Sequence, residues 1–321
     1  MFIPTSREVK SAAQASLKHP SYDPKKLALI YAAIATGVSL FFTIMNYILA
    51  AQIDSFDGLA GLGVKSILST VQTILPILSM LFVPFWEIGM LRAGMGFMRD
   101  EQVSPNTLTA GFRRFGPVLR LLLLRTVLLF AIVLISINVS SVIFSVTPWS
   151  APIENFLQTV TETGTLTEEM ISQMMPSMVP LYIIFFVVCC LLAIPFFYRL
   201  RMADFIVMDK PAGALAALLF SHRLMRGNRF RLFKLDLSFW WYYVIGFFSI
   251  AICYLDTIFQ MLGIPFPTSP DVAFFLCYGL YALIHFFLCW QAESYINTAY
   301  AIAFDSIAPK APETPTAEQP Q

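Results

Sequence analysis

Six long apolar blocks constrain the fold of this chain more than any other feature of its sequence. They lie at about 27–51, 66–98, 118–144, 178–208, 233–262 and 272–304. Each is longer than the roughly 20 residues that an α-helix needs to cross the hydrocarbon core of a bilayer. Charged residues make up only 13% of the chain, against about 25% in a typical soluble domain. The sequence therefore predicts an all-α, polytopic membrane protein with six transmembrane helices across residues 27–305.

The distribution of positive charge predicts the orientation of these spans. Of the 21 Lys and Arg residues, only Lys65 falls in a segment that lies outside if the N-terminus is cytoplasmic. Cytoplasmic loops of membrane proteins are enriched in Lys and Arg. We therefore expect both termini in the cytoplasm, an external loop at 145–177 and a disordered cytoplasmic tail at 306–321. The membrane itself is expected to be a bacterial cytoplasmic membrane.

Short interfacial helices are expected on the cytoplasmic side of the spans. Residues 1–26 contain a weakly amphipathic helix with Val9, Ala12, Ala13 and Leu17 on one side. Further short helices are expected to begin near Ser104 and Lys210. Each of the three would precede two spans, at intervals of roughly 100 residues, as in parallel two-span repeats. The same order is also that of any six-helix protein with cytoplasmic loops, so the repeat remains one of two interpretations.

A basic cluster lies directly before the fifth span. Its five cations fall within twelve residues: Arg223, Arg226, Arg229, Arg231 and Lys234. Near an anionic membrane surface, each such cation contributes about 1 kcal/mol of attraction. The cluster could therefore bind anionic lipid headgroups or a membrane protein partner. It could equally do no more than fix the orientation of the span that follows.

Span six carries a stripe of polar side chains. Tyr281, His285, Cys289 and Glu293 recur every four residues, so they spread over about 120° of the helix surface. Glu87 in span two is a further intramembrane acid. Ionisable side chains in a bilayer are costly, and they usually face the bundle interior and have a partner. The stripe is compatible with a proton relay or a solute site, and also with hydrogen bonds that only hold helices together.

Several function classes lack the motifs that they require. The sequence contains no P-loop, no dinucleotide fingerprint, no HExxH and no nucleophile elbow. One helix that supplies His, Cys and Glu offers too few ligands for a metal site, and the cations at span boundaries do not suggest nucleic-acid binding. We therefore expect no enzymatic activity, no cofactor, no metal and no nucleic-acid partner.

The segment at 221–239 resembles a motif of an uncharacterised bacterial family of integral membrane proteins, the domain of unknown function nine-seven-five. The family pattern is S-x-x-x-M-x-G-x-x-x-x-L-F-x-L-x-L-S-F. The chain matches it at Ser221, Met225, Gly227, Leu232, Phe233, Leu235, Leu237, Ser238 and Phe239. The stretches SREVKSAAQASLK and LTAGFRRF resemble its amino-terminal helix and mid-chain loop, whereas Ser294-Tyr295 replaces a usual Pro-Tyr pair. The resemblance implies a fold and a membrane location but brings no catalytic residue.

These observations favour a non-enzymatic membrane protein with a transport-associated, protective or accessory role. It would contact anionic lipid or a protein partner through its basic cluster. The alternative is a stand-alone permease or proton-coupled transporter, which predicts a polar cavity where Glu87, His285 and Glu293 converge. An accessory protein predicts that the same side chains are packed shut. A membrane enzyme for lipid-linked substrates comes third, because it would need paired acids or a metal at the inner surface.

Overall fold

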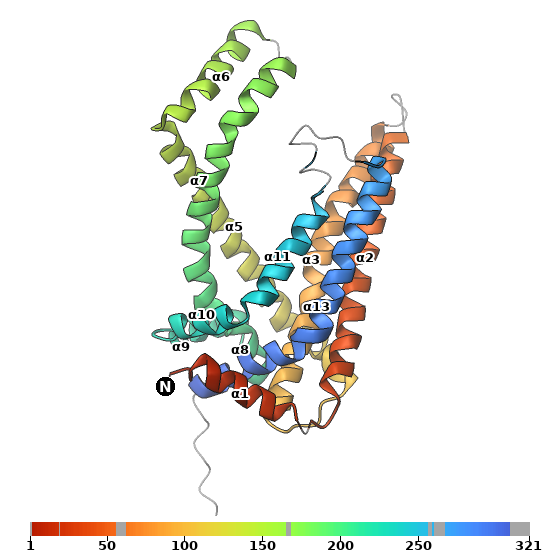
Figure 1. Cartoon of the computed structure of the whole chain (residues 1–321), viewed down its shortest axis with the longest axis vertical. Coiled ribbons are helices and arrows are strands. Elements are labelled where there is room, and N and C mark those ends of the chain that lie inside the picture. Colours follow the sequence, from red (N-terminus) through yellow and green to blue (C-terminus); the bar gives the residue numbers. More distant parts are fainter. Residues whose placement is uncertain are drawn as a thin grey trace, which may run out of the picture. The chain divides into compact units, whose positions relative to one another are not determined.

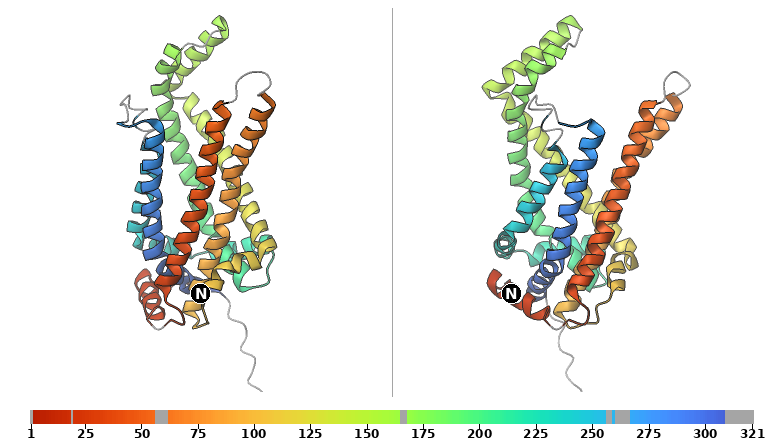
Figure 2. Two further views of the ribbon diagram at one scale, coloured as in Figure 1. Left: turned by 90° about the vertical axis from the view of Figure 1, so that its right-hand side faces the viewer. Right: turned by 45° about the vertical axis from the view of Figure 1, so that its right-hand side comes forward.

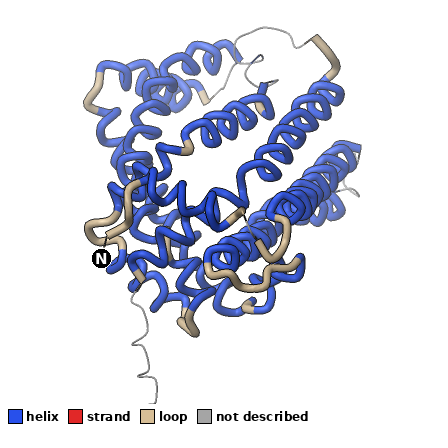
Figure 3. The backbone as a smooth tube through the Cα atoms, turned by 60° about the horizontal axis from the view of Figure 1, so that its bottom comes forward, coloured by secondary structure: helices blue, strands red, loops and turns tan. Residues whose placement is uncertain are grey.

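The computed structural model describes residues 2–18, 20–55, 62–164, 168–255, 259 and 267–308. The described residues are 87% helical and contain no strand, as Figure 3 shows. The predicted all-α fold is therefore confirmed. The predicted disordered tail lies outside the described residues from position 309 onward.

Five described helices are long and apolar enough to cross a membrane, and a bent pair of helices would make a sixth crossing. The five contain α2 (Pro24–Ser55), α3 (Leu62–Met98), α5 (Phe115–Ser145), α7 (Glu168–Leu200) and α13 (Pro270–Ile307). The bent pair consists of α10 (Arg229–Ser238) and α11 (Trp240–Cys253), which meet at 70°. This set is that of a polytopic membrane protein with five or six spans. The cytoplasmic location of both termini stays a prediction.

The expected fifth span at 233–262 differs from a single straight helix. Helix α10 ends at Ser238 and α11 begins at Trp240, with Phe239 between them. The Phe239 side chain is fully buried, and its backbone N–H donates to the carbonyls of Asp236 and Leu237. Residues 256–258 and 260–262 of this expected span lie outside the described part. As a result, the cations at 229–234 belong to a separate short helix that precedes the apolar one.

The chain forms two compact units. Unit 1 contains Met1–Leu119 and Met202–Gln321, and unit 2 contains Arg120–Arg201. In unit 2, α7 packs against η3 (Pro148–Ser150) and α6 (Ala151–Thr163). Helix α6 lies within the expected external loop at 145–177 and was not predicted from the sequence.

The short helices of unit 1 gather at one end of its long helices (Figures 1 and 2). They are α1 (Ser6–Ser16), η2 (Pro105–Thr109), α4 (Ala110–Arg113), α8 (Ala203–Asp209), α9 (Ala214–Leu224) and α10. A short-helix segment thus precedes each pair of long helices along the chain. The internal repeat stays a prediction, which superposition of the three segments would test.

The core of unit 1 lies where α2, α3 and α13 pack against one another. The core residues of α2 include several alanines. Alanine lets helix backbones approach closely, so α2 can pack tightly against its neighbours. The core members include Ala28, Ala32 and Ala35 on α2, Met90, Ala93 and Phe97 on α3, and Cys289 on α13.

Two glycines seat the η2–α4 segment on α3. A Cβ added at Gly89 of α3 would lie 1.9 Å from the carbonyl oxygen of Leu108 in η2. A Cβ added at Gly111 of α4 would lie 2.2 Å from the carbonyl oxygen of Phe85 in α3. The two backbones therefore touch directly, and only residues without a side chain fit at these positions.

Candidate functional site

The basic cluster occupies the end of α9, the turn that follows and α10. Arg223 lies in the last turn of α9, and Gly227 reverses the chain with a φ of +85°, a conformation that favours glycine. Four of the five cations are exposed, and Arg229 is half-buried. The structure therefore keeps the predicted cations together on one short stretch outside the long apolar helices.

The N-terminal segment packs against this turn. The Ile3 side chain is fully buried, and its backbone N–H donates to Asn228 Oδ1 over 3.0 Å. Arg231 Nη1 donates to the Ile3 carbonyl over 2.7 Å, and the Arg231 guanidinium lies 4.9 Å from the centre of the Phe2 ring. Arg231 thus has a structural role in addition to its charge.

Large apolar side chains are exposed beside the cations. Their exposed fractions lie between 41% and 64%, and they are Leu215 and Leu219 on α9 and Phe230, Phe233 and Leu237 on α10. Lys234 Nζ lies 4.8 Å from the centre of the Phe230 ring. Cations among exposed aromatic and aliphatic side chains are typical of helices that lie in a membrane interface.

Helix α1 lies over α10 and α13. Lys10 Nζ donates to the Ser238 carbonyl over 3.1 Å and lies 4.9 Å from the centre of the Phe239 ring. At the start of α1, Thr5 and Glu8 form a capping box, which satisfies free N–H groups of the first turn. The backbone N–H of Thr5 donates to Glu8 and holds the pKa of that carboxyl below its ordinary value.

The polar stripe of the predicted sixth span lies on α13. Cys289 Sγ is 3.7 Å and 3.8 Å from the two ring nitrogens of His285. Glu293 Oε1 accepts a hydrogen bond of 2.6 Å from the Tyr242 hydroxyl on α11. Glu293 Oε2 accepts one of 2.7 Å from Asn297 Nδ2, one turn further along α13. Both carboxylate oxygens of Glu293 are therefore engaged inside unit 1, and one of them joins two helices.

Glu87 on α3 is exposed. Glu87 and Glu293 are both within electrostatic range of Tyr31 on α2 and Cys289 on α13. The structure therefore brings Glu87 towards the Cys289 and Glu293 part of the stripe. Within the described residues, no group of three or more His, Cys, Asp or Glu side chains could hold a metal ion.

The sequence matches the family described as Protein of unknown function (DUF975) over residues 1–310. The chain belongs to this family. The match covers the described parts of both units, and it confirms the resemblance seen at 221–239. No curated protein and no solved structure matches the chain.

In this DUF975 protein, the sequence identified the residues of the basic cluster and of the polar stripe but not the partners that these residues contact. Tyr242, which binds Glu293, lies in an aromatic run that suggests a membrane boundary and gives no sign of a specific partner. Asn228, which holds Ile3, lies 225 residues away from it in the sequence. No local pattern signals contacts of this kind.

Proposed function

We propose that this DUF975 protein is a non-enzymatic protein of a bacterial cytoplasmic membrane whose basic cluster binds anionic lipid headgroups. Its role would be transport-associated, protective or accessory. The observation that carries the proposal is the joint exposure of cations and large apolar side chains on α9 and α10. Topology alone requires the cations, but it does not require exposed aromatic side chains between them.

The two kinds of side chain suit a membrane interface together. Phe230, Phe233 and Leu237 would enter the boundary between headgroups and acyl chains, where burial of apolar surface favours binding. Arg223 and Arg226 would then lie at headgroup level, where anionic lipid attracts each cation by about 1 kcal/mol. The predicted orientation places this surface at the cytoplasmic leaflet, which carries the negative surface potential.

Retention of anionic lipid tests the proposal. The protein is extracted gently from membranes that contain phosphatidylglycerol and phosphatidylethanolamine, and retained lipids are counted by native mass spectrometry. The test variant is Arg223→Gln/Arg226→Gln, because both side chains are exposed and neither holds the N-terminal segment. The matched control is Lys25→Gln/Lys26→Gln, which removes two exposed cations at the start of α2.

We expect the test variant, and not the control, to lose phosphatidylglycerol while it retains phosphatidylethanolamine. Equal retention in both variants would mean that the cluster only orients the span. A protein that co-purifies in a fixed ratio and is lost from the test variant would assign the cluster to a protein partner instead.

The stand-alone permease has less support. A solute or proton site needs a carboxylate that can exchange partners, whereas Glu293 accepts hydrogen bonds on both oxygens from Tyr242 and Asn297. This arrangement supports a structural role for the stripe. Proton uptake by proteoliposomes under a pH gradient would decide: uptake that is lost in Glu293→Gln, with the fold retained, would favour the permease.

A further inference from the structure

We propose that unit 1 contains a second anion site, in which Arg92 and Arg113 bind a phosphate-bearing ligand in adjoining cavities between α3, η2 and α4. This site is separate from the basic cluster and does not depend on the function proposed above. Neither arginine was a candidate from the sequence, because each looked like one of many cations at the end of a span.

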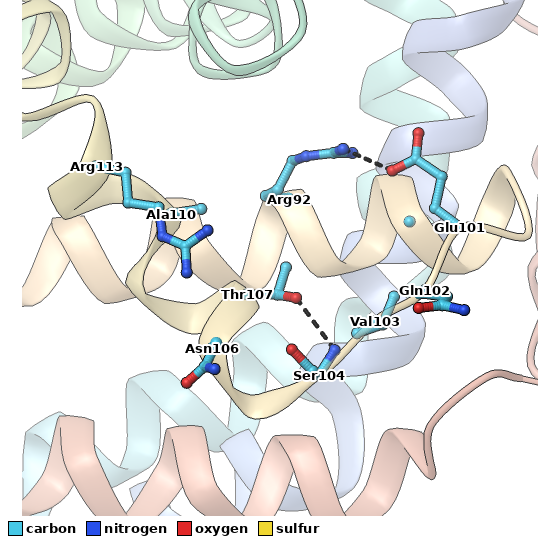
Figure 4. Close-up of a pocket in the computed structure, with 10 residues that line it drawn as sticks. Arg92, Glu101, Gln102, Val103, Ser104, Asn106, Thr107, Ala110 and Arg113 are labelled. Carbon is cyan, nitrogen blue, oxygen red and sulfur yellow. Dashed lines mark hydrogen bonds and ion pairs between the residues drawn. The ribbon is translucent and has the colours of Figure 1, made fainter.

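Two cavities adjoin at this place, with volumes of about 330 Å³ and about 390 Å³. Pockets that hold small ligands usually begin at about 300 Å³. The two cavities share Arg92, Glu101, Ala110 and Arg113 as lining residues. Figure 4 shows the first, with Arg113 on one side of Arg92, Glu101 on the other, and Thr107, Ser104 and Asn106 below them in the view.

The two arginines that line only the second cavity are already engaged in the fold. Arg99 forms ion pairs with Asp209 at 2.5 Å and with Asp305 at 3.1 Å. Arg114 Nη1 donates to the carbonyls of Val207 and Lys210. These contacts hold α8 against the end of α3 and the start of α5, so they fix one wall of the second cavity, where Asp209 balances the charge of Arg99.

Arg92 and Arg113 retain donors for a ligand. Arg92 Nη2 pairs with Glu101 at 2.6 Å, but Arg92 Nη1 is buried and has no hydrogen-bond partner among the described residues. Arg113 is exposed, and no hydrogen bond or ion pair joins it to the described part of the chain. A buried charged donor without an acceptor is unfavourable, and an oxyanion would supply the acceptor once the Arg92 guanidinium turns Nη1 into the cavity.

The chemistry of the lining favours phosphate over a simple halide. A guanidinium presents paired N–H donors that match two oxygens of a phosphate group. The Thr107 hydroxyl accepts from the Ser104 N–H over 3.2 Å, which leaves its own hydrogen free to donate into the first cavity. The side chains of Ser104 and Asn106 add further polar groups to that wall.

The negative charge of Glu101 disfavours anion binding in the cavities, so substitutions of Glu101 and of Arg113 should change the anion affinity in opposite directions. Its carboxylate lines both cavities and competes for Arg92. Removal of the Glu101 charge should therefore strengthen anion binding, whereas removal of the Arg113 charge should weaken it. A merely structural role for these residues predicts no such opposition.

The phosphate could belong to a soluble molecule or to a lipid headgroup, and two probes separate these sources. Binding of inorganic phosphate and of dioctanoyl phosphatidic acid is measured by isothermal titration calorimetry on the full chain in a neutral detergent. A soluble-ligand site binds inorganic phosphate. A headgroup site binds the short-chain phosphatidic acid and responds weakly to inorganic phosphate.

For the probe that binds, we expect Arg113→Gln to weaken the affinity by about tenfold, as for loss of one charge-assisted contact. Glu101→Gln should tighten it, and Arg223→Gln in the basic cluster should leave it unchanged. Because Arg113 is exposed and holds no described residue, its variant should keep the fold, which size-exclusion chromatography verifies. The proposal is overturned if neither probe binds, or if both cavity variants bind as the unmodified protein does.

Discussion

Replacement of Gly89 by alanine should destabilise unit 1, because it forces α3 and η2 apart. The added Cβ would meet the Leu108 carbonyl oxygen at 1.9 Å, whereas ordinary contact begins at 3.4 Å. The backbone of η2 would have to move by about 1.5 Å, since the atoms in conflict are backbone atoms that cannot rotate away. Overpacking of this kind costs roughly 1–3 kcal/mol. The helix gains about 0.5–1 kcal/mol from alanine, so the net loss in the free energy of unfolding should be about 0–2.5 kcal/mol.

Gly37→Ala is the matched control for this prediction. Gly37 lies in α2, where an added Cβ meets nothing within 4 Å. This variant should therefore gain the helix-propensity term of about 0.5–1 kcal/mol without any penalty. Thermal unfolding of both proteins in the same detergent, followed by tryptophan fluorescence, measures the difference. If Gly89→Ala is as stable as Gly37→Ala, the direct backbone contact between α3 and η2 is wrong.

Three further predictions concern the short helices. Asn228→Ala removes the acceptor of the buried Ile3 N–H, at a cost of about 1–3 kcal/mol, and should speed hydrogen exchange in the first five residues. Arg99→Gln breaks two partly exposed ion pairs and should lower the stability by about 1 kcal/mol in thermal unfolding. The pKa of Glu8 is lowered from 4.5 by the hydrogen bond from the Thr5 N–H. Its capping bond therefore stabilises α1 above about pH 4.5 and is lost as the pH falls through the lower folded-state pKa. Exchange in α1 should accelerate on acidification, and Glu8→Gln should abolish that pH dependence.

The long helices could be predicted from the sequence because their signal is local. A run of apolar residues longer than a bilayer is thick has few alternatives to a transmembrane helix, since hydrocarbon requires every backbone hydrogen bond to be internal. Helices α2, α3, α5 and α13 accordingly begin and end within a few residues of the expected spans. The family could be recognised for the same reason, because its motif at 221–239 is continuous in the sequence.

The bend at Phe239 could not be predicted, because both sides of it are compatible with one helix. The sequence from Phe233 onward becomes steadily more apolar, and nothing in it resembles a turn. The bend depends on burial of the Phe239 ring, which contacts Lys10 of α1 and packs edge-on against Tyr295 of α13. These contacts join segments more than fifty residues apart, so local propensity does not contain them.

The candidate sites also depend on contacts between residues that are distant in the sequence, and for this reason they could be predicted only in part. Positive charge is visible in a sequence, but the number of cations that remain available for a ligand depends on the fold. Arg231 in the basic cluster holds Ile3, whereas Arg223 and Arg226 are exposed to a ligand. In the cavities, Arg99 is held by two aspartates, whereas Arg92 keeps one terminal nitrogen that has no hydrogen-bond partner in the described part of the chain.

Both proposed anion-binding surfaces therefore depend on how the short segments of unit 1 are held in place within that unit. The N-terminal segment fixes the turn between α9 and α10 through Ile3, and so it sets the position of the basic cluster. Glycines at 89 and 111 let η2 and α4 lie directly on α3, and so they place Arg113 at the cavities that Arg92 also lines. A larger residue at either glycine would move Arg113 without any change in charge. If binding depended only on the number of cations, such a variant would bind the anion as tightly as the unmodified protein. If it depends on the shape of the cavity, the variant would bind the anion more weakly.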